Sequence, residues 1–180
     1  MKQLVEKNPL RKLLAASIAV TLSISLGACA NGSNAGFSGI KATCDEFVGG
    51  DAIDQVKVTG DYGTVPEATF TSPLSSDKIE TKVLSEGSGP AFTGDQFVEL
   101  EFMAINGGTG AKLQATKFDG TDFSAQVIAS GQYPDFCHAL SGVKAGSRIA
   151  VLFPAALAHK SEGNAESGIG KDDSVIYVID

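Results

Sequence analysis

The sequence contains no tryptophan, only two histidines and only three cysteines among 180 residues. A protein metal centre usually needs several imidazole or thiolate ligands, so this scarcity disfavours a dedicated metal site, and we expect no cofactor. Basic residues are also few, with 14 Lys and Arg against 21 Asp and Glu. Without residues 1–28, which hold four basic residues and one acidic residue, ten basic and twenty acidic residues remain. Nucleic acids, which bind basic surfaces, are therefore not expected partners.

Several catalytic motifs are missing as well. No lysine has the glycine spacing of a phosphate-binding loop, and no serine lies in a Gly-x-Ser-x-Gly turn. The chain shows no internal repeat. Its composition, 43% hydrophobic and 19% charged, is enough to fill the core of one domain. The sequence thus predicts a globular protein that lacks a conventional nucleophile–base–acid set.

The one long hydrophobic run, residues 13–26, follows four basic residues and precedes Gly27, Ala28 and Cys29. This order is typical of an export signal. A helix of this length rises only about 21 Å, which is short of a hydrocarbon core of roughly 30 Å, so a permanent membrane span is disfavoured. The tetrad Leu26-Gly27-Ala28-Cys29 resembles a bacterial lipobox, in which cleavage before the cysteine leaves its sulfur to carry diacylglycerol.

We therefore predict a lipoprotein signal peptide over residues 1–28 and lipidation of Cys29. Residues 29–43, rich in Gly, Ser and Asn, are predicted to form a flexible tether. The protein would then lie outside the cytoplasm, anchored to the cell membrane by lipidated Cys29. The alternative is an ordinary secretory signal, cut near Ala28 or Ala30, with Cys29 incidental.

Two thiols remain if Cys29 is modified, Cys44 and Cys137. An exported protein can keep a disulfide, and a bridge between these residues would close a long loop and stabilise the fold by a few kcal/mol. Two buried free thiols are the alternative. The sequence leaves both open, because it does not place the two Cα atoms within bridging distance.

Residues 44–76 are predicted to be an extended segment that precedes the domain. Alternating or uninterrupted apolar residues predict strands over 78–84, 96–105, 148–153 and 175–179, the last two central in a sheet. Only residues 134–140 suit a helix, and residues between the two central strands read as a long loop. The sequence predicts an α+β domain over residues 77–180, with an antiparallel β-sheet wrapped around one short α-helix.

The order of elements over residues 77–180 resembles that of the FKBP-type peptidyl-prolyl cis–trans isomerases. The matching stretches are KVLSEGSGPAFTGDQFVELEF, YPDFCHALSGVKAGSRIAVLFPAALAH and GIGKDDSVIYVID. The middle stretch is the most specific, with Pro134-Asp135 before the helix, Phe136 on it, a turn from Gly142 to Gly146, and Pro154 after the strand. The lipobox and tether also resemble those of exported actinobacterial lipoproteins that carry such domains.

This resemblance implies an aromatic pocket that holds a proline ring. Amide resonance raises a rotation barrier of about 18–20 kcal/mol, and a dry pocket with one donor lowers it without a nucleophile. Carried over position by position, the catalytic residues would be Phe102, Gln114, Phe136, His159 and Tyr177. The substrate-binding residues would be Leu113, Phe123, Tyr133 and Ile169.

The sequence departs from the family at several of these positions. Leu113-Gln114 replaces the usual Phe-Asp, Phe136 replaces a common Trp, and His159 replaces a Tyr. Tyr133 stands where an Ile normally offers its backbone N–H. The hydrophobic volume survives these changes; Gln114 can hydrogen-bond without the carboxylate charge, and His159 can donate.

We therefore expect a prolyl isomerase with a partly degenerate site, which assists the folding of exported proteins. Its partners would be prolyl-containing polypeptides, and the membrane through the N-terminal lipid. A non-catalytic peptide-binding or chaperone domain is the alternative. A third hypothesis, suggested by the chain stopping on its last strand at Asp180, is a structural FKBP-like domain of a longer lipoprotein.

Overall fold

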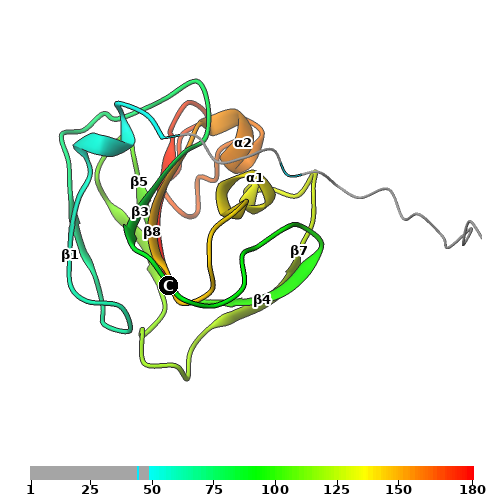
Figure 1. Cartoon of the computed structure of the whole chain (residues 1–180). Coiled ribbons are helices and arrows are strands. Elements are labelled where there is room, and N and C mark those ends of the chain that lie inside the picture. The colour runs from blue at the N-terminus through cyan, green and yellow to red at the C-terminus, as the bar shows by residue number, and fades with distance from the viewer. Residues whose placement is uncertain (1–43, 45–48) are drawn as a thin grey trace, which may run out of the picture. The chain divides into compact units, whose positions relative to one another are not determined.

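The structure, a computed structural model, describes Cys44 and residues 49–180 (Figure 1). The predicted signal peptide, Cys29 and the predicted tether lie outside the described residues. An antiparallel five-stranded sheet forms the centre, in the order β3-β8-β9-β5-β6. Its strands are β3 (Glu80–Ser85), β5 (Phe102–Asn106), β6 (Lys112–Ala115), β8 (Arg148–Phe153) and β9 (Val175–Ile179).

The two central strands β8 and β9 are the uninterrupted apolar runs of the sequence, which confirms their prediction. Every residue of β8 is buried, because both faces of the sheet are covered. Side chains alternate between faces along a strand. Accordingly Ile149, Val151 and Phe153 belong to one hydrophobic cluster, whereas Ala150 and Leu152 belong to the other.

Two short helices, α1 (Phe136–Leu140) and α2 (Ala155–His159), lie on the same side of the sheet in Figure 1. A two-stranded pair, β4 (Gln96–Leu100) with β7 (Ser124–Ile128), extends beside them. Helix α1 begins two residues later than predicted, because Asp135 is its N-cap and accepts a hydrogen bond from the His138 N–H. The predicted α+β class, an antiparallel sheet around a short helix, is confirmed.

Helix α2 is an addition to the predicted single helix, since residues 154–174 were expected to form a loop. Pro154 is its N-cap, and Ala155, Ala156, Leu157 and Ala158 are strong helix formers that carry it for little more than one turn. It ends at Lys160, which has a left-handed backbone with φ 57°. The helix is too short to show an amphipathic period in the sequence.

The predicted strand over 96–105 divides between two sheets. Residues of β4 pair with β7, whereas β5 pairs with β6 and β9. Glu101 lies at the junction, where its backbone pairs with Asp180 and its side chain accepts hydrogen bonds from the N–H groups of Asp119 and Gly120. The chain therefore changes its partner strands within one extended stretch. The alternation of apolar and acidic residues along that stretch does not reveal this change.

Residues 49–76 cover the other face of the sheet (Figure 1) and contain a 3-10 helix, η1 (Ile53–Gln55), and the pair β1 (Lys57–Thr59) and β2 (Glu67–Thr69). Ile53, Val56 and Leu74 are buried in the second hydrophobic cluster. The Glu80 carboxylate accepts hydrogen bonds from the N–H groups of Ala52 and Ile53, at 3.1 and 2.9 Å. The segment predicted as extended thus includes folded structure that closes the core.

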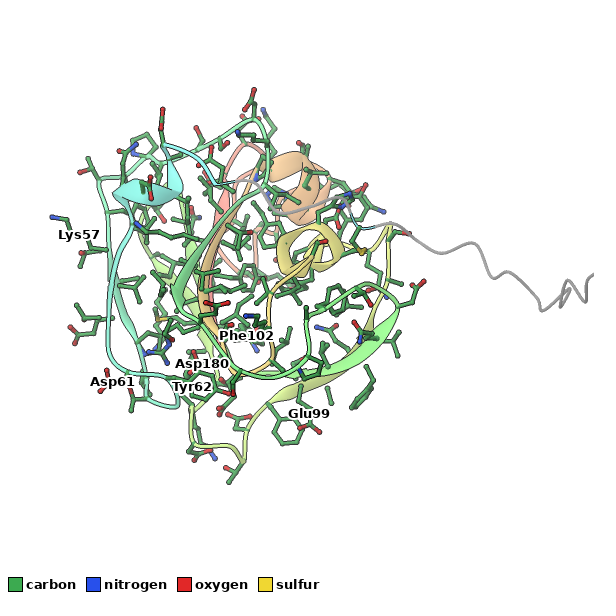
Figure 2. The ribbon with its side chains drawn as sticks, in the orientation of Figure 1. Lys57, Asp61, Tyr62, Glu99, Phe102 and Asp180 are labelled. Atoms are coloured by element: carbon green, nitrogen blue, oxygen red, sulfur yellow. A yellow bond between two sulfur atoms is a disulfide. The ribbon has the colours of Figure 1, made fainter. Side chains whose placement is uncertain are left out.

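A buried ion pair joins this layer to the sheet. Arg148 on β8 and Asp180 after β9 each have 2% side-chain exposure, with Nε and Oδ1 2.5 Å apart. The guanidinium also donates to the carbonyls of Gly60 and Thr64, both at 2.7 Å, and Asp180 accepts from the Gly63 N–H. Figure 2 shows Tyr62 of this turn next to Asp180, and both residues line one cavity. The pair therefore fixes the turn between β1 and β2.

Candidate active site

A cavity of about 410 Å³ opens beside α2, at the side of the sheet that carries the two helices. Its lining includes six of the nine side chains expected from the sequence: Leu113, Gln114, Tyr133, His159, Ile169 and Tyr177. We call this space the prolyl cavity. Another cavity of about 380 Å³, between β4 and residues 143–147, contains none of the nine.

Four aromatic rings meet beside the prolyl cavity, with Tyr177 at their centre. Its ring centroid lies 5.2 Å from that of Phe136, 5.6 Å from that of Phe153 and 5.7 Å from that of Phe102. The contacts with Phe136 and Phe153 are edge-to-face, an arrangement that aromatic quadrupoles favour. Phe102 lies below α1 in Figure 2. Phe102 and Phe136 thus support the wall of the cavity from behind Tyr177.

Strand register explains why these rings gather. Tyr177 on β9 lies opposite Ala104 on β5 and Val151 on β8. Phe102 and Phe153, each two residues from those partners, therefore emerge on the same face as Tyr177. The small side chain of Ala104 lines the cavity and leaves room in front of the phenol. The sheet thus provides both the aromatic wall and the space beside it.

The phenol of Tyr177 is a neutral donor. Burial raises the pKa of Tyr177 to about 12, so the hydroxyl keeps its proton at neutral pH. No group in the described part of the chain forms a hydrogen bond with this hydroxyl, and Tyr177 lines the open cavity. A bound molecule can therefore receive a hydrogen bond from it.

His159 lines the prolyl cavity but has no donor to offer. Its Nδ1 accepts from the Gly163 N–H at 3.0 Å, and its Nε2 lies 2.8 Å from the carbonyl oxygen of Asp173. A carbonyl can only accept, so Nε2 carries the proton and donates it there. The expectation that His159 donates to a substrate is therefore corrected, because the loop backbone occupies both ring nitrogens.

The loop over residues 160–174 is held by a further set of hydrogen bonds. The buried Asn106 amide donates to Asp173 and to the Gly168 carbonyl, at 2.8 and 3.0 Å. The bonds that Asp173 accepts from Asn106 and from the Gly170 N–H lower the pKa of its carboxyl. The loop is thereby fixed in a position where Ile169 lines the cavity.

The remaining expected residues differ in their placement. Gln114 pairs with Ala104 across β5 and β6; its side chain is exposed and has no hydrogen-bond partner among the described residues. The backbone N–H of Tyr133 likewise has no acceptor in the part of the chain that the structure describes. Phe123, just before β7, is 42% exposed and does not line the prolyl cavity, so its expected place in the pocket is not found.

Several residues of the site escaped the sequence reading. Phe153 was recognised as part of a strand, but a strand buried on both faces does not indicate which side chains face the site. Ala104, Ala158 and Val175 line the cavity as small side chains, which carry no chemical signal in a sequence. Once the register of β5, β8 and β9 is known, the alternation of side chains between the two faces of the sheet identifies Ala104, Phe153 and Val175. Ala158 lies on α2 and is not identified in this way.

Cys44 and Cys137 form a disulfide, with Cα atoms 5.2 Å apart. Cys137 is fully buried on α1, next to Phe136, and the Ser141 hydroxyl donates to the Cys44 carbonyl at 3.1 Å. The bridge thus attaches residue 44 to the helix that supports the aromatic wall. Of the two alternatives left open by the sequence, the structure has the bridge.

The residues that the structure describes contain no cluster of three or more His, Cys, Asp or Glu side chains able to hold a metal ion. No helix in that part of the chain has the length and apolar character needed to span a bilayer. The arrangement itself is a cavity lined by the rings of Tyr133, His159 and Tyr177, in which the phenol of Tyr177 is a neutral donor. It can hold an apolar ring and donate hydrogen bonds to a neighbouring amide.

Comparison with known proteins agrees with this geometry. No protein-family model matches the chain. A curated relative, "FK506-binding protein" of Streptomyces anulatus, is 26% identical over 115 residues, which are 64% of this chain and 93% of the relative.

Among solved structures, the N-terminal domain of FKBP42 from Arabidopsis thaliana has a TM-score of 0.51 at 17% identity, covering 64% of this chain and 93% of that one. A peptidyl-prolyl cis-trans isomerase from Pseudomonas syringae has a TM-score of 0.49 at 18% identity, covering 59% of this chain and 74% of that one. The described domain has the FKBP fold, and its sequence is similar to that of the curated FK506-binding protein.

Proposed function

We propose that this protein is an FKBP-type peptidyl-prolyl cis–trans isomerase that acts on exported polypeptides. The observation that carries the proposal is the open cavity beside four converging aromatic rings, within an FKBP fold. The proline ring would rest in the prolyl cavity against the ring of Tyr177. The hydroxyl of Tyr177 and the N–H of Tyr133 are the donors available to the peptide that carries it.

Isomerisation on this surface needs no proton abstraction. The planar prolyl amide has partial charge separation, which water stabilises and an apolar wall does not. The transition state is twisted and loses that resonance, so an aromatic cavity stabilises it relative to the planar ground state. A donor that meets the carbonyl oxygen or the amide nitrogen in the twisted form adds to this preference.

The departures at Gln114 and His159 predict a modest rate. Gln114 brings no carboxylate charge to the cavity, and both His159 nitrogens are engaged by the loop. What remains is the aromatic wall, the phenol and the backbone donor. These groups suffice for the desolvation and hydrogen bonding described above, with less electrostatic help than a carboxylate provides.

The test is the cis-to-trans relaxation of a short X-Pro-Phe peptide with the purified full chain, compared with the uncatalysed relaxation. Acceleration proportional to protein concentration supports the proposal. Binding of the peptide without acceleration would instead indicate the non-catalytic peptide-binding domain. Neither acceleration nor binding would leave a structural role.

Export and lipid anchoring form a separate part of the proposal. The basic residues, the apolar run and the tetrad ending in Cys29 support it, and the Cys44–Cys137 disulfide is compatible with an oxidising compartment. Mass spectrometry of the N-terminus isolated from membranes should find diacylglycerol on Cys29. An unmodified mature N-terminus would overturn the anchor without affecting the isomerase assay.

A further inference from the structure

A third cavity, of about 440 Å³, adjoins the prolyl cavity. The two share Tyr133, Pro134 and Lys160, so they lie on either side of these residues. The rest of its lining includes Phe136, Gln126 and Gln132. We call this space the flanking cavity. A peptide that places its proline in the prolyl cavity brings its neighbouring residues within one or two residue lengths, about 3.5 Å each, of the shared boundary.

Lys160 is the charged group of the flanking cavity. It is the only Asp, Glu, Lys or Arg among the residues lining that cavity in the described chain. Its Nζ lies 4.8 Å from the centroid of the Tyr133 ring, a cation–π contact that holds the ammonium at the boundary between the two cavities. The left-handed backbone at Lys160 ends α2 and directs the chain away from the helix at this point.

No carboxylate neutralises this ammonium within the described residues. Four other cations there are paired, and the pairs are Lys82–Asp54, Lys144–Glu86, Arg148–Asp180 and Lys171–Asp172. The other described lysines without an ion pair line neither cavity; they are Lys57, Lys78, Lys112 and Lys117. Glu162 is the acidic residue that lines the prolyl cavity, and it does not line the flanking cavity. Lys160 lines both cavities, so an acidic ligand group would meet its attraction without opposition from a lining carboxylate only in the flanking cavity.

The two glutamines add hydrogen-bond donors. The Gln132 Oε1 accepts from the Ala129 N–H at 3.2 Å, which orients the amide and leaves its NH₂ group available. Gln126 pairs with Val98 through the backbone of the β4–β7 ladder, and its side chain has no hydrogen-bond partner among the described residues. A carboxylate only accepts hydrogen bonds, so an ammonium and amide NH₂ groups are a complementary set for it.

We propose that the flanking cavity is a subsite for the residue adjacent to the substrate proline, and that Lys160 gives it a preference for Asp or Glu. This rests on the proposed isomerase function. The subsite selects among prolyl sequences by charge, whereas the prolyl cavity selects the imino-acid ring by shape. The favoured substrates are acidic–prolyl or prolyl–acidic segments of unfolded chains.

The experiment uses the purified full chain and two peptide series, one varied before the proline and one after it, with Glu, Gln or Lys at the varied position. In at least one series we expect kcat/KM for Glu to exceed that for Gln by about two- to fivefold at low ionic strength, as for an exposed ion pair. Lys should fall below Gln in the same series. The ratio should shrink toward one in 0.5 M salt, because such pairs are screened.

Variants of Lys160 test whether this residue causes the preference for Glu over Gln. Lys160→Met keeps the aliphatic stem and removes the charge, and should reduce the Glu to Gln ratio to about one; Lys160→Arg should retain it. Lys171→Met is the matched control, since Lys171 is an exposed lysine that pairs with Asp172 and lines neither cavity. A ratio near one in both series for the unmodified protein, or a preference that survives Lys160→Met, would overturn the subsite.

The same peptides, measured for binding by fluorescence anisotropy, separate this proposal from the isomerase itself. Acceleration without a Lys160-dependent preference overturns the subsite alone. A Lys160-dependent difference in Kd without acceleration supports the subsite and overturns the isomerase. Equal or absent binding of the Glu and Gln peptides, with no acceleration, overturns both.

Discussion

The ring of Phe136 on α1 meets the ring of Tyr177 on β9 nearly edge-on, with centroids 5.2 Å apart and planes at 77°. Phe136 also packs against Phe153 at 5.4 Å. One helix residue thus supports two rings of the sheet, and the helix is in turn tied to residue 44 by the disulfide at the next position. The aromatic wall depends on this contact for its shape.

Truncation of Phe136 tests that dependence. Phe136→Ala should lower the free energy of unfolding by about 3–5 kcal/mol, because it removes a buried aromatic side chain. Phe136→Leu nearly conserves the volume and should cost less than about 1.5 kcal/mol, yet reduce kcat/KM up to about tenfold by removing the edge-to-face contacts. Urea unfolding and the relaxation assay measure the two effects.

The control is Phe97→Leu, a change at a ring that is 64% exposed. Unchanged activity in Phe136→Leu would contradict a role for the aromatic wall in catalysis.

The Tyr177 hydroxyl is tested by Tyr177→Phe, which keeps the ring and its contacts. We expect kcat/KM to fall about three- to tenfold, the equivalent of one hydrogen bond, with little change in KM. The Tyr62→Phe change at an exposed tyrosine should have no effect. Equal activity of Tyr177→Phe and the unmodified protein would show that the phenol makes no bond to the twisted amide.

The raised pKa of Tyr177 also predicts a pH dependence of stability. The folded pKa, about 12, exceeds the ordinary value of 10, so the unfolded state loses this proton first as the pH rises. The contribution is therefore fully present below pH 10 and is lost as the pH rises toward 12. Thermal unfolding at pH 8 and pH 11 should show a larger decrease for the unmodified protein than for Tyr177→Phe. Equal decreases would contradict the burial of the phenol.

His159 is predicted to affect substrate binding indirectly, by holding the loop over residues 160–174 in place. His159→Phe keeps a ring in the cavity wall but removes the bonds to Gly163 and Asp173. KM should rise severalfold while kcat changes by less than about twofold, and amide exchange at Gly163 should accelerate because its acceptor is gone. Loss of kcat with an unchanged exchange rate at Gly163 would show instead that His159 contacts the substrate directly.

The sequence predicted the elements of the fold that are determined by residues adjacent in the chain. Uninterrupted β-branched runs identified β8 and β9, and Pro134-Asp135 identified the start of α1 to within two residues. Helix α2 was missed because it is too short to show an amphipathic period. The division of residues 96–105 was missed because it depends on a distant partner, the backbone of Asp180.

The same distinction applies to the site. Of the nine residues that the family resemblance implied, six line the prolyl cavity, and Phe102 and Phe136 belong to the aromatic rings behind it. The resemblance misjudged His159, whose availability depends on how residues 160–173 fold back onto its nitrogens. It also missed Phe153, because burial on both faces conceals which way a side chain points. Facts that require long-range register or loop closure were inaccessible to pattern alone.

The pair Arg148–Asp180 offers a test of how the layer over residues 49–76 is attached. Arg148→Met should lower the free energy of unfolding by about 3–5 kcal/mol, since it leaves a buried carboxylate without its cation. The carbonyls of Gly60 and Thr64 lose their donors in the same variant. Urea unfolding measures the loss, with Lys144→Met as control; Lys144 and Glu86 form an exposed pair worth at most about 1 kcal/mol.

The double variant Arg148→Met with Asp180→Leu separates charge from packing. If the cost of Arg148→Met is mainly an uncompensated charge, removing that charge should recover more than half of the lost stability, because two apolar side chains of similar volume tolerate burial. The recovery should leave faster amide exchange in residues 60–64, whose carbonyls and N–H groups the ion pair had bound. A double variant no more stable than Arg148→Met would mean that these backbone hydrogen bonds, and not the buried charge, hold the layer to the sheet.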